Sequence, residues 1–124
     1  MLFRSPANGV LQFFTGPGES LMEMLQADVP AARFVKAFSC VGNAHMVNPV
    51  FTIAGASVRP TMFICGNDDA ARAEVAVILD QFGHAVEDLG KAEAARGIEP
   101  MCIVWCTPGF LRNQWNHAFK LIKR

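Results

Sequence analysis

The chain has 124 residues, of which 52% are hydrophobic and 18% charged, a composition typical of one folded domain and not of a disordered chain. Eleven basic residues balance eleven acidic ones, so the charge gives no support for binding to nucleic acid or to an anionic membrane. No apolar run reaches the roughly 18 residues of a membrane span and no signal-peptide layout is present, which predicts a cytoplasmic protein.

The N-terminal stretch is expected to be an arm followed by a short helix. Residues 1–9 show no periodicity and fit an arm or truncated lead-in before a single α/β domain over residues 10–124. Residues 10–14 (VLQFF) fit either a short strand or a docked loop. Ser20 and Glu23 have the spacing of a capping box, which predicts that a helix begins at the next residue.

Residues 33–38 (RFVKAF) are predicted to form a strand, with Ser39 and Cys40 directly after it. Ligands of open α/β sheets bind just beyond the carboxyl ends of strands, so Ser39 and Cys40 are candidate site residues. The alternative is a loop serine beside a buried cysteine. Residues 43–47 are expected to form a short helical turn and residues 50–59 a loop.

Residues 60–90 are predicted to form a strand, a turn, a helix and a second strand. Residues 62–65 form a continuous apolar run, as in a strand that is covered on both faces. Asn67 or Asp68 is placed to cap the helix, and Gly83 is placed to end it in a left-handed conformation. The helix carries one apolar stripe, formed by Ala71, Val75, Ile78 and Phe82. This pattern predicts a βαβ unit and an α/β sheet.

The C-terminal third is predicted to be largely helical. Residues 91–97 (KAEAARG) are strong helix formers, and residues 110–124 carry an amphipathic stripe that predicts a last helix. Residues 98–108 are nearly all apolar, so we expect them to be buried in the core or against a partner.

Cysteine spacing gives no metal site. Neither CxxC nor a zinc-like Cys/His spacing occurs. Apolar neighbours predict buried, reduced thiols, with a redox or metal role as the alternative, for Cys40, Cys65, Cys102 and Cys106.

Catalytic motifs are missing from the sequence. It contains no GxGxxG, GxxxxGK[ST], GxSxG or HExxH, so no catalytic residue and no metal ligand is assigned. The glycine-rich GPGES at residues 16–20 precedes a helix, but a turn with a capping box already explains it.

Several segments, taken in order, resemble one known family: ARFVKAFSCVGNAHMVNP, PTMFICGNDDAARAEVAVILDQFG, VEDLG, AEAARGIEP and PGFLRNQWNHAFKL. The family is the NADP-dependent reductases of the deazaflavin-dependent type, related to the cytoplasmic reductase domain of membrane metalloreductases. The resemblance covers roughly residues 7–124 and only the latter half of such a protein. It implies a partial Rossmann-like sheet, the C-terminal half of a doubly wound NAD(P)-binding domain, with C-terminal helices. The glycine-rich turn that holds the cofactor pyrophosphate belongs to the unmatched half.

The resemblance also implies hydride transfer between NADP(H) and a deazaflavin or flavin. It places Phe38, Ser39 and Cys40 at the cofactor, although family members usually carry Asn or His where this chain has Ser39. The stretch AARGIEP is similar to the family's A-R-x-x-E segment near the acceptor pocket, which maps onto Arg96 and Glu99. From the residues alone, these two side chains fit a surface ion pair equally well.

Three interpretations follow. The first is the C-terminal portion of an oxidoreductase, inactive alone, with a homodimer interface in residues 98–122, because the family's C-terminal helices often join two subunits. The second is a non-catalytic dimerising or binding module derived from that family, and the third is a thiol-redox protein using Cys102 and Cys106. Because a common sequencing adapter encodes LFRS (residues 2–5), we also hypothesise that Met1–Ser5 is an assembly artefact and the gene model truncated.

Overall fold

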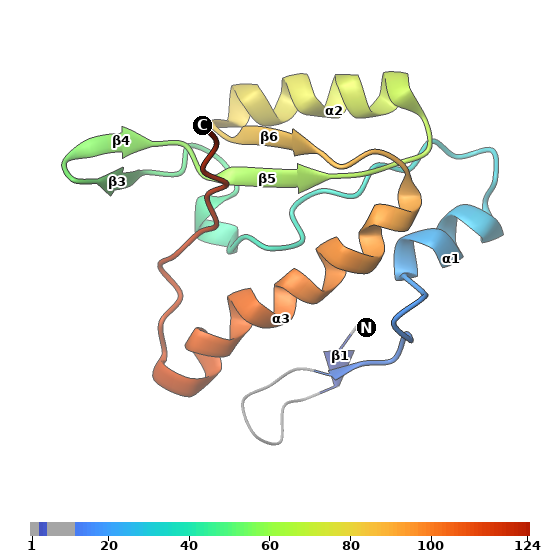
Figure 1. The fold of residues 1–124 in the computed structure, drawn as a ribbon, viewed down its shortest axis with the longest axis horizontal. Coiled ribbons are helices and arrows are strands. Elements are labelled where there is room, and N and C mark those ends of the chain that lie inside the picture. The colour runs from blue at the N-terminus through green and yellow to red at the C-terminus, as the bar shows by residue number, and fades with distance from the viewer. Residues whose placement is uncertain (1–2, 5–11) are drawn as a thin grey trace.

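The computed structural model describes residues 3–4 and 12–124 (Figure 1). A β–α–β unit carries helices on both of its faces, and a small hairpin projects from it. The elements in chain order are β1 (Phe3–Arg4), β2 (Gln12–Phe13), α1 (Leu21–Asp28), the 3-10 turn η1 (Asn43–His45), β3 (Phe51–Ile53), β4 (Ala56–Val58), β5 (Thr61–Ile64), α2 (Asp69–Phe82), β6 (Ala85–Asp88), the 3-10 turn η2 (Ala92–Ala94) and α3 (Ala95–Arg112).

The predicted α/β class, with a Rossmann-like β–α–β unit and a C-terminal helix, is confirmed. Strands β5 and β6 pair in parallel, from Thr61 opposite Ala85 to Ile64 opposite Asp88, and α2 connects them. Asp68 caps α2, because its Oδ1 accepts the N–H of Ala71 at 2.7 Å. Gly83 ends α2 with φ +102°, the left-handed conformation that glycine adopts without a steric penalty. Local signals therefore set the limits of this unit.

Strand β5 is covered on both faces, as its apolar run predicts. Met62 and Ile64 pack with Leu79 of α2, whereas Phe63, and Cys65 just after the strand, pack with residues of α1 and α3 on the other face. The predicted stripe of α2 is wrong at Ile78, which is 41% exposed while its neighbour Leu79 is fully buried. The positions of α2 that face the core recur every four residues: Ala71 and Leu79 are buried, and Val75 is partly buried.

The prediction of a regular strand over residues 33–38 is wrong, although the segment does lie beside β5. A single antiparallel bridge joins them: Lys36 donates its N–H to the carbonyl of Cys65 at 2.8 Å and accepts the Cys65 N–H at 3.3 Å. Phe38 then turns into the left-handed region at φ +57°, which ends the extended conformation. Gly66 permits the approach, because a Cβ there would overlap the carbonyl oxygen of Phe34.

The loop predicted over residues 50–59 is also wrong, because β3 and β4 form an antiparallel hairpin there. Phe51 pairs with Val58, and the two connecting residues, Ala54 and Gly55, have φ of +50° and +80°. A turn with positive φ at both central residues has the twist that matches the two strands of a hairpin with a two-residue loop. The turn expected over residues 43–47 is present as η1.

The predicted capping box forms with a modified pairing. Ser20 Oγ accepts the N–H of Glu23 at 3.1 Å, and the Ser20 hydroxyl donates to the Glu23 carboxylate at 2.6 Å. The carboxylate therefore binds the hydroxyl of the cap and not its backbone amide. The expected arm over residues 1–9 and the segment 10–14 lie largely outside the described residues. Where these two stretches are described, β1 pairs antiparallel with β2.

The helix predicted over residues 110–124 is wrong, because α3 ends at Arg112 and the remaining residues form an irregular tail. Asn113 adopts φ +52°, and the tail turns back so that Trp115 packs against Trp105 at a ring-centroid distance of 5.7 Å. Residues 98–108 are only partly buried: Trp105 is 8% exposed but Val104 is 61% exposed. Among the described residues, no helix is long and apolar enough to span a membrane.

Candidate functional site

The predicted cofactor residues lie at the opposite end of β5 from the turn that follows it. Residues 33–38 run antiparallel to β5, so Phe38 lies beside Met62, near the start of β5. The carboxyl end of β5 leads instead to Asn67 and Asp68. The ligand-site rule therefore points to the turn after β5, whereas residues 38–40 form a separate candidate region near the start of β5.

The first region contains Phe38, Ser39 and Cys40. The N–H of Phe38 donates to Met62 Sδ at 3.2 Å. The Phe38 ring also makes an edge contact with the His84 ring, with ring centroids 6.2 Å apart. Ser39 is half-buried, and its hydroxyl forms no hydrogen bond within the described part of the chain. Cys40 is buried, and burial raises the pKa of its thiol to about 11, so it is not a nucleophile at neutral pH. Ser39 is therefore the group here that is free to bind a ligand.

His84 next to Phe38 carries an unused acceptor. The residue is 1% exposed, and its Nε2 lies 2.8 Å from the carbonyl oxygen of Met46, which requires a proton on Nε2. Nδ1 is buried and has no partner among the described residues. Buried polar atoms are rarely left unpaired, so this nitrogen is an exception in the packing beside the candidate cofactor residues.

The predicted acceptor residues bind α1 and do not pair with each other. Arg96 binds the Glu23 carboxylate with two hydrogen bonds, at 3.0 Å through Nε and 2.7 Å through Nη2. Glu99 accepts the backbone N–H groups of Leu21 at 3.0 Å and Met22 at 3.1 Å. These are free amides of the first turn of α1, where the helix dipole also favours a carboxylate. Both side chains thus anchor α1 to α3.

Lys36 links the two predicted sets of site residues. Its Nζ lies 3.1 Å from Glu99 Oε1, with the Lys36 side chain 17% exposed and the Glu99 side chain 2% exposed. Its backbone bridges to Cys65, and Phe38 follows two residues later. Glu99 thus fixes the segment that carries the candidate cofactor residues. The sequence analysis overlooked Lys36, although one charged residue inside an apolar extended run is the signal that could have identified it.

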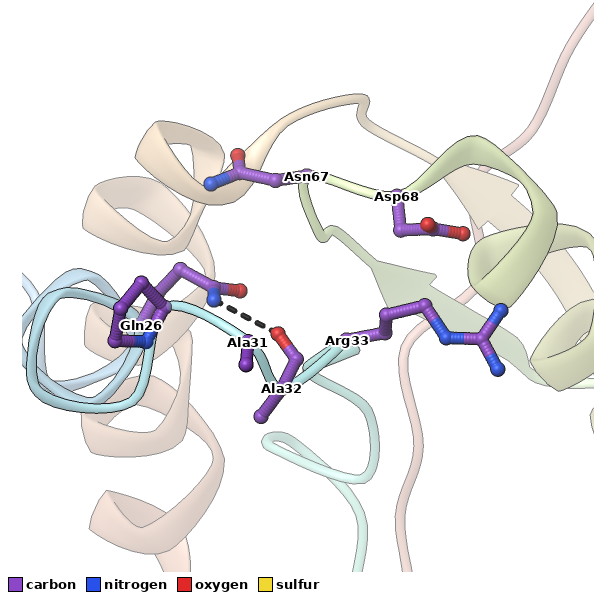
Figure 2. Close-up of a pocket in the computed structure, with 7 residues that line it drawn as sticks. Gln26, Ala31, Ala32, Arg33, Asn67 and Asp68 are labelled. Carbon is purple, nitrogen blue, oxygen red and sulfur yellow. Dashed lines mark hydrogen bonds between the residues drawn. The ribbon is translucent and has the colours of Figure 1, made fainter.

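The second region is a pocket of about 370 Å³ beyond the carboxyl end of β5 (Figure 2). Asn67 and Asp68 lie along its upper rim, but both have structural partners: Asn67 Oδ1 accepts the N–H of Ala92, and Asp68 caps α2. Gln26 donates to the Ala32 carbonyl at 2.8 Å. The other lining residues are Pro30, Ala31 and Arg33.

Arg33 differs from the other polar residues of this pocket. It is exposed and forms no ion pair or hydrogen bond within the described part of the chain. The volume lies within the range of small-molecule sites. The pocket therefore offers one free cation beside amide and carboxylate groups that are already engaged.

The partly buried cysteine pair does not support thiol chemistry. Cys102 and Cys106 are free thiols on α3 with their Sγ atoms 3.8 Å apart. Burial, followed by the neighbouring Cys106, raises the pKa of the Cys102 thiol to about 12, which leaves almost no thiolate at neutral pH. Among the described residues, no group of three or more His, Cys, Asp or Glu side chains is placed to hold a metal ion.

Among the solved structures that are similar to this chain, one has a fold that matches nearly the whole chain. It is the crystal structure of "a putative f420 dependent nadp-reductase" from Arthrobacter sp. FB24. The match has a TM-score of 0.85 at 31% sequence identity and covers 98% of this chain. This chain spans only 54% of the Arthrobacter chain. No family profile and no curated protein matches.

The similarity supports an oxidoreductase-like fold of the NADP-reductase type. Identity above the level at which only a fold is shared, together with continuous coverage, agrees with the resemblance found in the sequence. The similarity covers about half of the Arthrobacter chain, so it extends to the fold of that half and not to the activity of the whole Arthrobacter protein.

Proposed function

We propose that this chain is the C-terminal portion of a cytoplasmic NADP-dependent oxidoreductase that transfers hydride between NADP(H) and a deazaflavin or flavin. The observation that carries the proposal is the match to the Arthrobacter protein at a TM-score of 0.85 over 98% of this chain. By itself the chain should be inactive, because it contains no glycine-rich turn for the cofactor pyrophosphate.

The segment Phe38–Cys40 is proposed to contact the nicotinamide end of the cofactor. Ser39 supports this role, because its hydroxyl is free among the described residues and both donates and accepts hydrogen bonds. Phe38 and Cys40 would then shape the site by packing. A buried thiol with a pKa raised to about 11 supplies no charge to a hydride transfer.

Arg96 and Glu99 are proposed to serve the acceptor pocket in different ways. The Arg96 side chain is 46% exposed, so it can contact a bound acceptor while Glu23 orients its guanidinium group. Glu99 is buried against α1 and Lys36, so it acts as a positioning residue.

The homodimer proposed through residues 98–122 is supported by apolar exposure along that stretch. Val104 is 61% exposed, Leu111 53% and Ile122 83%. Several large apolar side chains exposed on one segment are typical of an interaction surface. The same observation favours the second candidate function, a non-catalytic dimerising module, in which this surface is the whole function.

Reconstitution separates the two functions. The 124-residue chain would be co-expressed with the portion of the Arthrobacter chain that it does not match, and NADPH binding and oxidation would be measured with a deazaflavin and with a flavin acceptor. The oxidoreductase proposal expects turnover only with both portions present. Turnover should fall in the Ser39→Ala variant and remain unchanged in the Ser57→Ala variant, since Ser57 lies on the exposed hairpin.

Two results would contradict the proposal. A soluble, assembled pair that neither binds nor oxidises NADPH would favour the dimerising module. Saturable NADPH binding by the 124-residue chain alone would show that its cofactor site does not depend on the unmatched portion.

A further inference from the structure

The C-terminal end of α2 contacts both ends of the segment 38–46, which contains the three proposed cofactor residues. At the first end, the Phe38 ring lies against the rings of Phe82 and His84, with centroids 6.3 Å and 6.2 Å apart. At the last end, His84 Nε2 donates a hydrogen bond to the carbonyl oxygen of Met46 at 2.8 Å. The His84 side chain therefore takes part in both attachments.

The backbone of His84 is fixed independently of its ring. Its N–H donates to the carbonyl of Leu79 at 3.0 Å, within the turn that ends α2. The Arg59 guanidinium group donates to the carbonyl of His84 at 2.8 Å and to that of Asp80 at 2.8 Å. Because these bonds hold the backbone to α2, the ring is a fixed attachment point for the segment 38–46.

A histidine at this position carries a cost that an apolar side chain would avoid. The residue is 1% exposed, and its Nδ1 has no partner among the residues that the structure describes. A buried polar atom without a partner is destabilising. An apolar side chain of similar size could pack against Phe38 without this cost. What His84 adds is the donor at Nε2, which binds the far end of the segment.

We infer that His84 is a positioning residue for the proposed cofactor segment, because its ring and its Nε2 fix both ends of residues 38–46. Fixing both ends of a loop removes conformational freedom that a ligand would otherwise have to restrict on binding. Ser39 directly follows the first attachment, so its free hydroxyl is held in one place. The role of Ser39 at the cofactor rests on the proposed function, whereas the attachment of the segment does not.

Amide hydrogen exchange of the 124-residue chain tests the attachment without any cofactor. His84→Leu keeps an apolar side chain and removes the Nε2 donor. We expect the amides of His45 and Asn48, both hydrogen-bonded near the last attachment, to exchange about tenfold faster in this variant. The Leu89 amide, which is bonded to the end of β5, is the internal control and should change little. His84→Gln, whose side-chain amide is also a donor, should restore slow exchange.

Turnover of the reconstituted pair tests the positioning role. In His84→Leu, kcat for NADPH oxidation should fall about tenfold or more, because a displaced group near the reacting atoms slows the chemical step. The Kd for NADPH should change by less than about threefold, because we place the pyrophosphate site in the unmatched portion. His84→Gln should recover most of the lost kcat. A residue that only stabilised the fold would not divide kcat from Kd in this way.

Other results overturn the inference in distinct ways. Unchanged exchange at His45 and Asn48 in His84→Leu would mean that the segment is held without His84. Faster exchange at Leu89 as well would mean that the variant loosens the whole fold. Faster exchange confined to the segment, with an unchanged kcat, would show that its ends do not position the cofactor residues. A wild-type pair without turnover would refute the proposed function, and the exchange rates would then decide the attachment by themselves.

Discussion

Replacing Glu99 by glutamine should destabilise the protein strongly, although the two side chains have nearly the same shape. The Glu99 side chain is 2% exposed and binds Lys36 Nζ at 3.1 Å and two backbone amides of α1 at 3.0 and 3.1 Å. All three partners are donors. The glutamine amide has one acceptor oxygen, so its NH2 group must face at least one donor while Lys36 loses its counter-charge.

The magnitude follows from the burial of this group. Removing one partner of a buried ion pair costs about 3–5 kcal/mol. Lys36 is 17% exposed and regains some hydration, which reduces the cost, so we expect Glu99→Gln to lower the free energy of unfolding by about 2–4 kcal/mol. For a small domain that is stable by about 5–15 kcal/mol, this loss is large.

Urea unfolding followed by circular dichroism measures the effect. Glu74→Gln is the control, because Glu74 is exposed on α2. In a Lys36→Met background the cost of Glu99→Gln should be smaller, with a coupling energy of about 0.5–3 kcal/mol. If Glu99→Gln and Glu74→Gln agree within about 0.5 kcal/mol, Glu99 does not anchor α1 and this reasoning is refuted.

Three further predictions concern a close backbone approach, an ion pair and a thiol. Gly66→Ala should destabilise the fold by about 1–3 kcal/mol or more in thermal unfolding, because its Cβ would overlap the Phe34 carbonyl oxygen. The hydrogen bonds from Arg96 lower the pKa of Glu23 below its ordinary value of 4.5. The contribution of the Glu23–Arg96 pair to the free energy of unfolding should therefore be complete above pH 4.5 and disappear as the pH falls through the lowered pKa, which an acid titration of stability measures. The Cys40 thiol, buried and with a pKa raised to about 11, should react with a disulfide reagent only after unfolding.

Matched controls make these three results interpretable. Gly18→Ala should have little effect, because an added Cβ meets nothing within 4 Å, and an equal loss in both glycine variants would contradict the packing argument. Glu23→Gln should remove its part of the acid-dependent loss; an unchanged acid profile would mean that the ion pair contributes nothing. The denatured chain should show all four thiols reactive, whereas rapid native labelling of Cys40 would show that its surroundings open.

The sequence predicts the β5–α2–β6 unit well because its signals act within a few residues. Asp68 bonds to an amide three residues away, and Gly83 needs only its own freedom of φ. The helical pattern over residues 110–124 fails because the competing interactions are tertiary. The indole N–H of Trp105 donates to the carbonyl of His117 at 3.1 Å, and Thr61 donates its N–H to the carbonyl of Phe119 at 2.8 Å. Amphipathic periodicity contains no information about such partners.

For the candidate site, too, the sequence indicates local features but not contacts between distant segments. The resemblance to a known family selected Arg96 and Glu99, but their sequence spacing suggested a pair on one helix. Their partners on α1 lie 73 to 78 residues earlier in the chain, at the start of that helix. Contacts over that separation depend on how α1 packs on α3, and the sequence gives only the caps of α1.

Lys36 links Glu99 to the proposed cofactor residues. Its side chain is fixed by Glu99 and its backbone by Cys65, and Phe38 follows two residues later. Through Lys36, Glu99 therefore fixes the backbone that leads into residues 38–40. A substitution at Glu99 should consequently disturb both proposed regions: the anchoring of α1 to α3 directly, and the segment 38–40 through Lys36.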